Sequence, residues 1–313
     1  MTAQRTVLEA DLVPIAGRRF QPTGFPDLGA AEFDLADGGK ALLVESAQSM
    51  ANRLEAATWD AARNDQPEAL SALPYVRITD YEGAFLSSSR LEAHRLASAY
   101  VMKGKVGGED GVKWLLARLG LAAGRPLDHR AVARACFALD PVSLVHGVFF
   151  AVKDWPWQPR ISRAVTSFVE AYQIVPAVSG GVKRDLVNNQ AKDGATSEGY
   201  GMVPYHRVEY TAATITAYFT VDREQFRSYG LSEPATALLE ALAEFEIGSL
   251  LDGGLRLRTA CDLTVREMRG QRPDTADAAA RVAKLAAECA AELGQVTEVV
   301  WSGKTATGRG KAQ

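Results

Sequence analysis

The sequence predicts an α+β protein whose single sheet domain carries two insertions. Three observations predict this class. Strand-like and helix-like segments alternate irregularly, without the regular strand–helix repeat of a parallel-sheet fold. Residues 86–134 are helical and basic, with nine Lys or Arg against four Asp or Glu. Residues 180–204 contain five glycines and almost no large apolar residue, which is typical of an excursion without a core of its own.

The first half of the chain is predicted to start with a strand at residues 5–16, followed by a loop that Gly and Pro punctuate. A long helix is expected over 40–62, because Leu43, Ala47, Met50 and Leu54 recur at intervals of three to four residues. The other expected elements of this half are strands at 75–81 and 143–152 and helices at 90–101, 111–120 and 128–139.

The second half is expected to return to the sheet. Residues 205–221 are rich in β-branched and aromatic side chains, which favours a long strand. The other expected elements are helices at 160–172, 222–229, 233–250 and 274–293 and strands at 173–179, 255–265 and 296–301.

Composition excludes several classes of protein. The 313 residues carry 35 Lys or Arg against 38 Asp or Glu, a net charge of −3, and are 47% hydrophobic. These values exclude a disordered chain, a collagen-like chain and a disulfide mini-protein. They also count against a uniformly basic nucleic-acid binder, so a polyanion would have to bind through local patches. The length alone suggests about two domains, or one domain with insertions.

The three cysteines, Cys136, Cys261 and Cys289, lie far apart without a C-x-x-C pair. An odd number cannot form a closed disulfide set, so buried thiols in a reducing cytosol are expected. The first twelve residues lack the apolar stretch of a signal peptide, and no apolar run reaches the ~18 residues of a membrane span. A cytoplasmic protein is therefore expected.

Enzyme and metal motifs do not match the sequence. Ser302–Thr305 resembles the end of a phosphate-binding P-loop, but Glu298 stands where that motif needs glycine. The four histidines are not at metal-ligand spacing, so neither a metal nor a cofactor is expected. His146 is open to two interpretations, a structural histidine or one that faces a ligand. A loop aspartate such as Asp80 or Asp185 is more often solvated than catalytic.

Short basic or polar clusters remain as candidate binding residues. Arginine and lysine neutralise phosphates, while hydroxyl and amide groups donate to phosphate oxygens. Glycine lets backbone N–H groups approach an anion closely. The candidates are Arg18, Arg19, Ser46, Ser49, Asn52, Arg53, His94, Arg95, Ser179, Gly180, Gly181, Lys183, Arg184, Arg256 and Arg258.

Six stretches together resemble a family of CRISPR-associated proteins. They are RRFQPTGFPDLGAAEF (18–33), LLVESAQSMANRLE (42–55), EAHRLASAY (92–100), LDPVSLVHGVFF (139–150), PAVSGGVKRD (176–185) and GLRLRTACDL (254–263). The resemblance is to the repeated backbone subunit of the type I-G effector complex, formerly type I-U, in the RAMP superfamily. It runs in order from about residue 5 to about residue 270.

This resemblance implies one domain over 1–313, a modified RRM-like (ferredoxin-like) palm. Helical fingers would span 82–140 and a β-hairpin thumb 181–204. It also implies a subunit without catalytic activity, whose copies stack along the CRISPR RNA and present it to the target DNA strand. The first loop, the first helix and the strand end before the thumb would contact the guide backbone.

The implied partners are the CRISPR RNA, the target DNA strand, further copies of the chain, the large subunit and the subunit that holds and processes the guide's handle. One alternative is a RAMP-type endoribonuclease that cleaves guide-paired RNA, with Asp185 or His146 as its candidate catalytic residue. Another is a scaffold that binds no nucleic acid.

Overall fold

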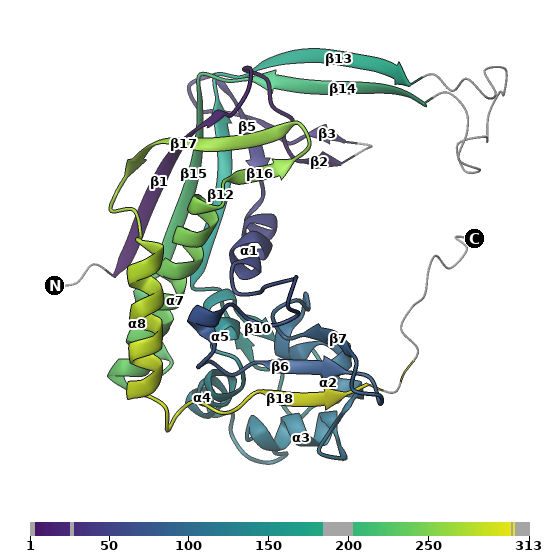
Figure 1. Ribbon diagram of the computed structural model, residues 1–313, viewed down its shortest axis with the longest axis vertical. Helices are drawn as coiled ribbons and strands as arrows, with labels where there is room; N and C mark the ends of the chain where they lie inside the picture. Colours follow the sequence, from purple (N-terminus) through teal and green to yellow (C-terminus); the bar gives the residue numbers. More distant parts are fainter. Residues whose placement is uncertain (1–3, 26–27, 184–202, 302, 304–313) are drawn as a thin grey trace.

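A computed structural model describes residues 4–25, 28–183, 203–301 and 303. Figure 1 shows an upper part built on a large sheet and a lower part of short helices and strands. A long hairpin projects from the top of the sheet, on the side of the molecule where helix α1 (Ala47–Ala56) lies. One cluster of buried apolar side chains includes residues of both parts, so they share a core.

The upper part is a seven-stranded sheet in which every neighbouring pair is antiparallel. In sheet order the strands are β16 (Leu255–Arg258), β17 (Cys261–Arg269), β1 (Arg5–Pro14), β15 (Thr214–Asp222), β12 (Val165–Tyr172), β5 (Lys40–Glu45) and β4 (Glu32–Asp34). In this sheet the first long strand, β1, lies between β17 and β15, two strands from the last third of the chain.

Helices cover one face of this sheet. Along β1, Leu8, Ala10 and Leu12 are buried while their neighbours are partly exposed, the period-two pattern of a strand with one covered face. Helix α7 (Glu233–Asp252) packs on β15, α1 packs on β12, and α8 (Thr275–Glu288) packs against α7. Helix α6 (Arg223–Ser228) connects β15 to α7.

The lower part combines a small sheet with short helices. Its strand order is β7 (Phe85–Ser88), β6 (Val76–Thr79), β18 (Thr297–Val300), β8 (Lys105–Val106) and β9 (Glu109–Asp110). The helical elements are η1 (Glu68–Leu70), η2 (Arg95–Ala97), α2 (Ala99–Lys103), α3 (Gly111–Arg118), α4 (His129–Leu139) and α5 (Val142–His146). Because β18 pairs in parallel with β6, the end of the chain returns to this part.

Three two-stranded sheets complete the fold. The projecting hairpin is formed by β13 (Val175–Lys183) and β14 (Val203–Thr211). The predicted thumb, 181–204, includes residues 184–202, which lie outside the described part of the chain. The other pairings are β10 (Val148–Phe149) with β11 (Arg160–Ile161) and β2 (Gly24–Phe25) with β3 (Gly29–Ala30).

Several sequence predictions of secondary structure are wrong. The helix expected over 90–101 is limited to η2 and α2, and the single strands expected over 205–221 and 255–265 are each divided into two strands, β14 and β15 in the first case and β16 and β17 in the second. The helix expected over 160–172 is the strand β12, preceded by the short strand β11, and its side chains alternate between buried and partly exposed. The helix expected over 40–62 is a strand, β5, followed by α1, because Ser46 caps a helix that starts only at Ala47. Of the strand expected over 143–152, residues 143–146 belong to the helix α5, and only Val148 and Phe149 form a strand, β10.

The prediction of buried free thiols is confirmed. All three cysteines are free and buried. No helix among the described residues is long and apolar enough to span a membrane.

The charge surplus over 86–134 is partly cancelled in three dimensions. Arg90 pairs with Asp140 and Arg95 pairs with Glu55, and both acids lie outside that range. All four side chains are buried, so two of the nine basic residues add nothing to the surface charge.

Candidate nucleic-acid interface

The loop that carries Arg18 and Arg19 is held against the root of the projecting hairpin. Phe20 is fully buried and exchanges two backbone hydrogen bonds with Tyr210 of β14, at 2.9 and 2.8 Å. Arg19 forms an ion pair with Glu209 at 3.2 Å and remains largely exposed. Arg18 is exposed and has no ion pair with any described residue. This attachment places both arginines where the hairpin leaves the sheet.

The hairpin contributes polar groups at the same place. The Ser179 hydroxyl donates to the Glu209 carboxylate at 3.4 Å, so Ser179 and Arg19 meet at one acid. Gly180 lies opposite His206, and Gly181 lies opposite Tyr205. Lys183 ends β13, while Arg184 lies beyond the described residues. The structure therefore brings Arg19 and Ser179 together, whereas Lys183 is paired with Val203 at the other end of the hairpin.

The start of α1 is fixed by its own polar side chains. The Ser46 hydroxyl accepts a hydrogen bond from the Ser49 N–H at 3.2 Å, which caps the helix. Asn52 is exposed, and its amide oxygen accepts from Gln48 at 3.2 Å. Ser46 thus has a structural function, while Asn52 stands at the surface. The predicted RNA contacts of Ser46, Ser49 and Asn52 stay predictions.

Two of the predicted arginines share one buried carboxylate. Glu45 is almost fully buried, and it pairs with Arg53 at 3.6 Å and with Arg258 at closer range. Arg53 also donates to the carbonyl of Leu257, and Arg258 donates to the carbonyl of Val44 at 3.1 Å. One carboxylate balances two guanidinium groups, so a positive charge remains at this junction of β5, α1 and β16.

Arg256 lies beside that junction. The adjacent Leu255 and Leu257 are buried, so Arg256 points away from the core and is exposed. Its side chain has no partner among the residues that the structure describes, although its carbonyl accepts from Arg53 at 3.3 Å. We call Arg18, Arg19, Arg53, Arg256 and Arg258 the basic track. Backbone bonds from Gln21 to Ala260 and from Phe20 to Tyr210 connect its members.

His94 and Arg95 differ in their surroundings. His94 is exposed. Arg95 is buried at φ +51°, and its guanidinium donates to Glu55 at 2.5 and 2.7 Å and to the carbonyl of Gly147 at 2.9 Å. All three guanidinium nitrogens of Arg95 are therefore engaged inside the protein, where they join α1 to the lower part. RNA contact by Arg95 stays a prediction.

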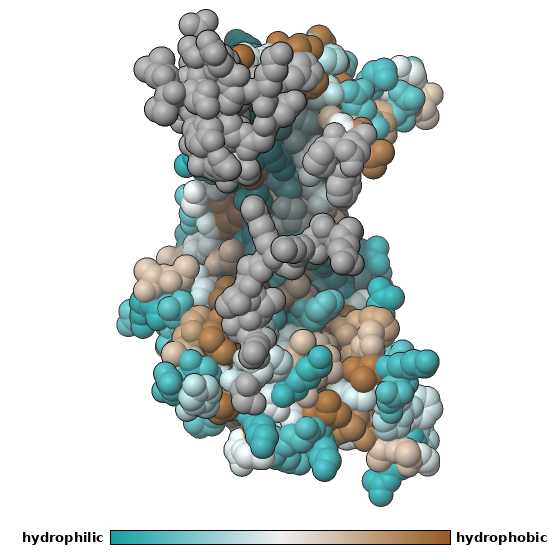
Figure 2. All heavy atoms as spheres, turned by 90° about the vertical axis from the view of Figure 1, so that its right-hand side faces the viewer, coloured by the Kyte–Doolittle hydropathy of each residue, from teal (hydrophilic) through white to brown (hydrophobic). Residues whose placement is uncertain are grey.

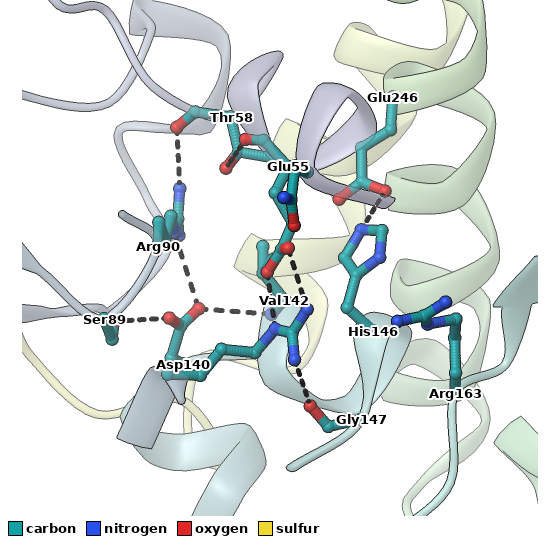
Figure 3. A network of polar contacts seen from close by, with 12 residues as sticks. Glu55, Thr58, Ser89, Arg90, Asp140, Val142, His146, Gly147, Arg163 and Glu246 are labelled. Atoms are coloured by element: carbon teal, nitrogen blue, oxygen red, sulfur yellow. Dashed lines mark hydrogen bonds and ion pairs between the residues drawn. The ribbon is translucent and has the colours of Figure 1, made fainter. Parts of the chain in front are cut away.

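Figure 3 shows that Arg90 and Asp140 belong, with the Arg95–Glu55 pair, to a buried polar network between the upper and lower parts. The Asp140 carboxylate accepts from the Ser89 hydroxyl at 2.5 Å and from the Val142 N–H at 3.1 Å. Burial raises the pKa of Asp140, and the Arg90 charge opposes that rise. A buried ion pair with satisfied hydrogen bonds fixes the geometry of the elements that it joins.

His146, left open by the sequence, is a fully buried residue of α5. Its Nε2 lies 2.8 Å from a carboxylate oxygen of Glu246 on α7, which is also fully buried. Burial raises the pKa of Glu246, and His146 opposes that rise. The histidine side chain is therefore not exposed to a nucleic acid in this structure. The described residues contain no cluster of three potential metal ligands.

Two arginines that the sequence did not single out extend the basic surface. Arg163 donates to the carbonyl of Ala47 at 3.2 Å and to the side chain of Gln48 at 3.0 Å, which places it at the start of α1. Arg160 is exposed, and its guanidinium lies 5.8 Å from the centre of the Phe149 ring. Both lie in the segment that the sequence predicts to be a helix, and no local pattern in the sequence brings them to α1.

Comparisons with known proteins identify the family. The family model described as CRISPR-associated protein GSU0053 matches residues 6–176, more than half of the chain. The chain belongs to this family. The matched region contains most of the basic track, α1 and both arginines beside it. No curated protein matches the sequence.

Solved structures resemble the chain only distantly. A chain of a structure titled "CRISPR RNA-guided surveillance complex, pre-nicking" shares 14% identity at a TM-score of 0.43, covering 86% of this chain and 78% of that one. Csc2 of Thermofilum pendens shares 10% identity at a TM-score of 0.31, covering 92% of this chain and 75% of that one.

Proposed function

We propose that this protein is a CRISPR RNA-binding backbone subunit of a type I effector complex. Membership of a CRISPR-associated family carries the proposal. The basic track supports it, because it gathers five arginines at the hairpin root and the start of α1 against few acids. Arginine in such a position neutralises backbone phosphates without reading bases.

The order of the long strands supports the RRM-like palm of this proposal. A ferredoxin-like fold has the chain order β-α-β-β-α-β. Here β1, α1, β12, β15, α7 and β17 follow in that order, and the sheet order is β17-β1-β15-β12. The hairpin of β13 and β14 emerges between β12 and β15, in the position expected for a thumb. The helices of the predicted fingers fall between α1 and β12.

The subunit acts by holding the guide, not by cleaving it. Its function is to fix the backbone of the CRISPR RNA in the cytoplasm while base edges stay available to the target DNA strand. Copies of the chain follow one another along the guide, with the large subunit and the handle-processing subunit as further partners, in a complex of type I-G. The contact of the buried His146 with Glu246 favours a structural role for this residue and so supports a subunit without catalytic activity.

A salt-dependence experiment tests RNA binding. The double variant Arg18→Ala with Arg256→Ala removes two exposed arginines of the basic track. We expect weaker binding of single-stranded RNA for all sequences alike. We also expect the slope of log K against log salt to fall by about 0.7 for each phosphate that the variant no longer neutralises. Fluorescence anisotropy over a salt series measures both quantities.

The matched control removes the same charge elsewhere. Arg5→Ala with Arg272→Ala acts on two exposed arginines, at the start of β1 and just before α8, away from α1 and the hairpin. This variant should bind RNA as the parent does. Equal slopes for the parent and the Arg18/Arg256 variant would contradict the basic track as the RNA-binding surface. Cleavage of labelled complementary RNA by the assembled complex would contradict a subunit without catalytic activity.

A further inference from the structure

A cavity lies where the lower part meets the start of α1. Its volume is about 390 Å³, within the ~300–1,000 Å³ range of small-ligand sites. Three segments line it: residues 93–95, the turn from α5 into β10, and the stretch from Arg160 to Arg163. Figure 2, which views the molecule from the side of α1 and the hairpin, shows that the molecule narrows between its two parts. We call this space the arginine cavity.

The lining of the arginine cavity is cationic. It includes Arg95, Arg160, Arg163, His94 and the buried His146, and it contains no Asp or Glu. Four other cavities of the described residues each have at least one carboxylate in their lining. Glu55 contacts the lining residue Arg95, but its carboxylate already accepts two hydrogen bonds from that arginine. The other two arginines therefore face the cavity without a carboxylate to balance them.

These two arginines retain hydrogen-bond donors. A guanidinium has five N–H groups. Arg163 forms two hydrogen bonds, to Ala47 and to Gln48, so three of its donors remain for a ligand. Arg160 forms no hydrogen bond with any described residue, and the Phe149 ring beneath it restrains its plane. Such forks match the oxygens of a phosphate.

The charges already present favour an anion. Burial lowers the pKa of Arg163, the neighbouring positive charge of Arg95 lowers it further, and Glu55 partly opposes this change. The guanidinium groups of Arg95 and Arg163 thus repel each other, and a bound anion between them would relieve that repulsion. Gly147, at φ +80°, allows β10 to pass close to the backbone of Ile161 and Arg163, which keeps the walls of the cavity together.

We propose that the arginine cavity binds a phosphate group. Resting on the proposed function, we assign it to a phosphodiester of the guide RNA, because Arg163 touches the first turn of α1 and so continues the basic track. His94 at the rim adds a further donor to the same phosphate. The cavity makes Arg160 and Arg163 residues that bind RNA, although the sequence placed neither in a motif.

The test uses Arg160→Gln and Arg163→Gln in the full chain. Arg118→Gln is the matched control, since Arg118 is also exposed and lies 5.9 Å from an aromatic ring, that of Trp114, but on α3. In the first arm, inorganic phosphate is titrated at constant ionic strength and the thermal midpoint is followed. The parent and Arg118→Gln should be stabilised, whereas the Arg160 and Arg163 variants should lose that stabilisation.

The second arm measures single-stranded RNA binding over a salt series. Each cavity variant should lower the salt slope by about 0.7, and Arg118→Gln should leave it unchanged. Because Arg160 is exposed and forms no internal bond, its variant should keep the thermal midpoint of the parent without phosphate.

The outcomes separate the cavity from the function. A parent that binds no RNA but loses phosphate stabilisation in both cavity variants would refute the proposed function and leave the phosphate site standing. A parent that binds RNA with the same slope as Arg160→Gln and Arg163→Gln would overturn the assignment to RNA. Equal phosphate stabilisation of all four proteins would overturn the site itself.

Discussion

Asp140→Ala is expected to lower the free energy of unfolding by about 3–5 kcal/mol, the cost of leaving one partner of a buried ion pair alone. The Asp140 side chain is 1% exposed and that of Arg90 is 0% exposed. The carboxylate lies 3.4 Å from Arg90 and accepts from Ser89 and from the Val142 N–H. After the substitution, Arg90 would keep two main-chain carbonyls and the Tyr75 ring as partners, but no carboxylate.

Further variants separate the contributions to this loss in the free energy of unfolding. Ser89→Ala removes the hydrogen bond to the Asp140 carboxylate, which is worth about 1.5–3 kcal/mol, and leaves the charges paired. It also removes the bond that the hydroxyl accepts from the buried Val76 N–H at 3.1 Å, so its cost includes that second loss. Ser143→Ala is the matched control, because Ser143 is equally buried, lies nearby on α5, and has a hydroxyl without a partner among the described residues. Its loss should change the free energy of unfolding by less than about 0.5 kcal/mol.

Urea denaturation followed by tryptophan fluorescence measures these differences, since Trp59 stacks against Phe85 in the lower part. A double-mutant cycle then tests the cause. Arg90→Met should destabilise Asp140→Ala less than it destabilises the parent, because no unpaired charge then stays buried. If Arg90→Met cost the same in both backgrounds, the two side chains would not be coupled, and the reasoning would be refuted.

Three further predictions concern titration, backbone and thiols. Burial raises the pKa of Glu246 above its ordinary value of 4.5, so the unfolded chain loses this proton first. The free energy of unfolding should then fall as pH rises from about 4.5, and Glu246→Gln should remove that part of the fall in a urea series between pH 4 and 7. Gly147→Ala should lower the thermal midpoint, at a cost of about 1–3 kcal/mol, because φ is +80° and the new Cβ would lie 2.7 Å from a backbone oxygen, whereas Gly17→Ala, at φ +70° in open space, should cost less. Burial raises the pKa of Cys261 and of Cys289 to about 11 and that of Cys136 further, so all three thiols should react with a disulfide reagent only when the chain unfolds; fast labelling of the native protein would contradict their burial.

The sequence was sufficient for the elements that have one strong local signal. The long helix α7 and the strand β1 follow from apolar periodicity, and both lie close to their predicted bounds. Residues 160–172 failed because Val165, Phe168, Val169 and Tyr172 also recur at a helical spacing. Val165, Ser167, Val169 and Ala171 lie at every second position, which is equally compatible with a strand, and all four are buried in the structure. Contact with two neighbouring strands decides between them.

The candidate site shows the same limit at the level of single residues. The sequence placed Arg18, Arg19 and Arg256 in basic clusters, and the structure leaves all three at the surface. It treated His94 and Arg95 alike, yet Arg95 is buried against Glu55, which is 40 positions earlier. No local pattern predicts which arginine finds a buried acid from another element. That depends on packing between segments far apart in the chain.

The distribution of acids explains how a chain of net charge −3 can present a basic surface. Glu45, Glu55 and Asp140 are buried against arginines, so they stabilise the fold and project little negative potential outward. In contrast, α7 and its flanks, 222–252, carry seven acids against two bases and lie across the molecule from the hairpin. The proposed backbone subunit would benefit from this arrangement, because the guide RNA would meet arginines while neighbouring copies would not be uniformly cationic. Reversing charge on exposed acids of α7 should therefore affect association between copies more than RNA affinity.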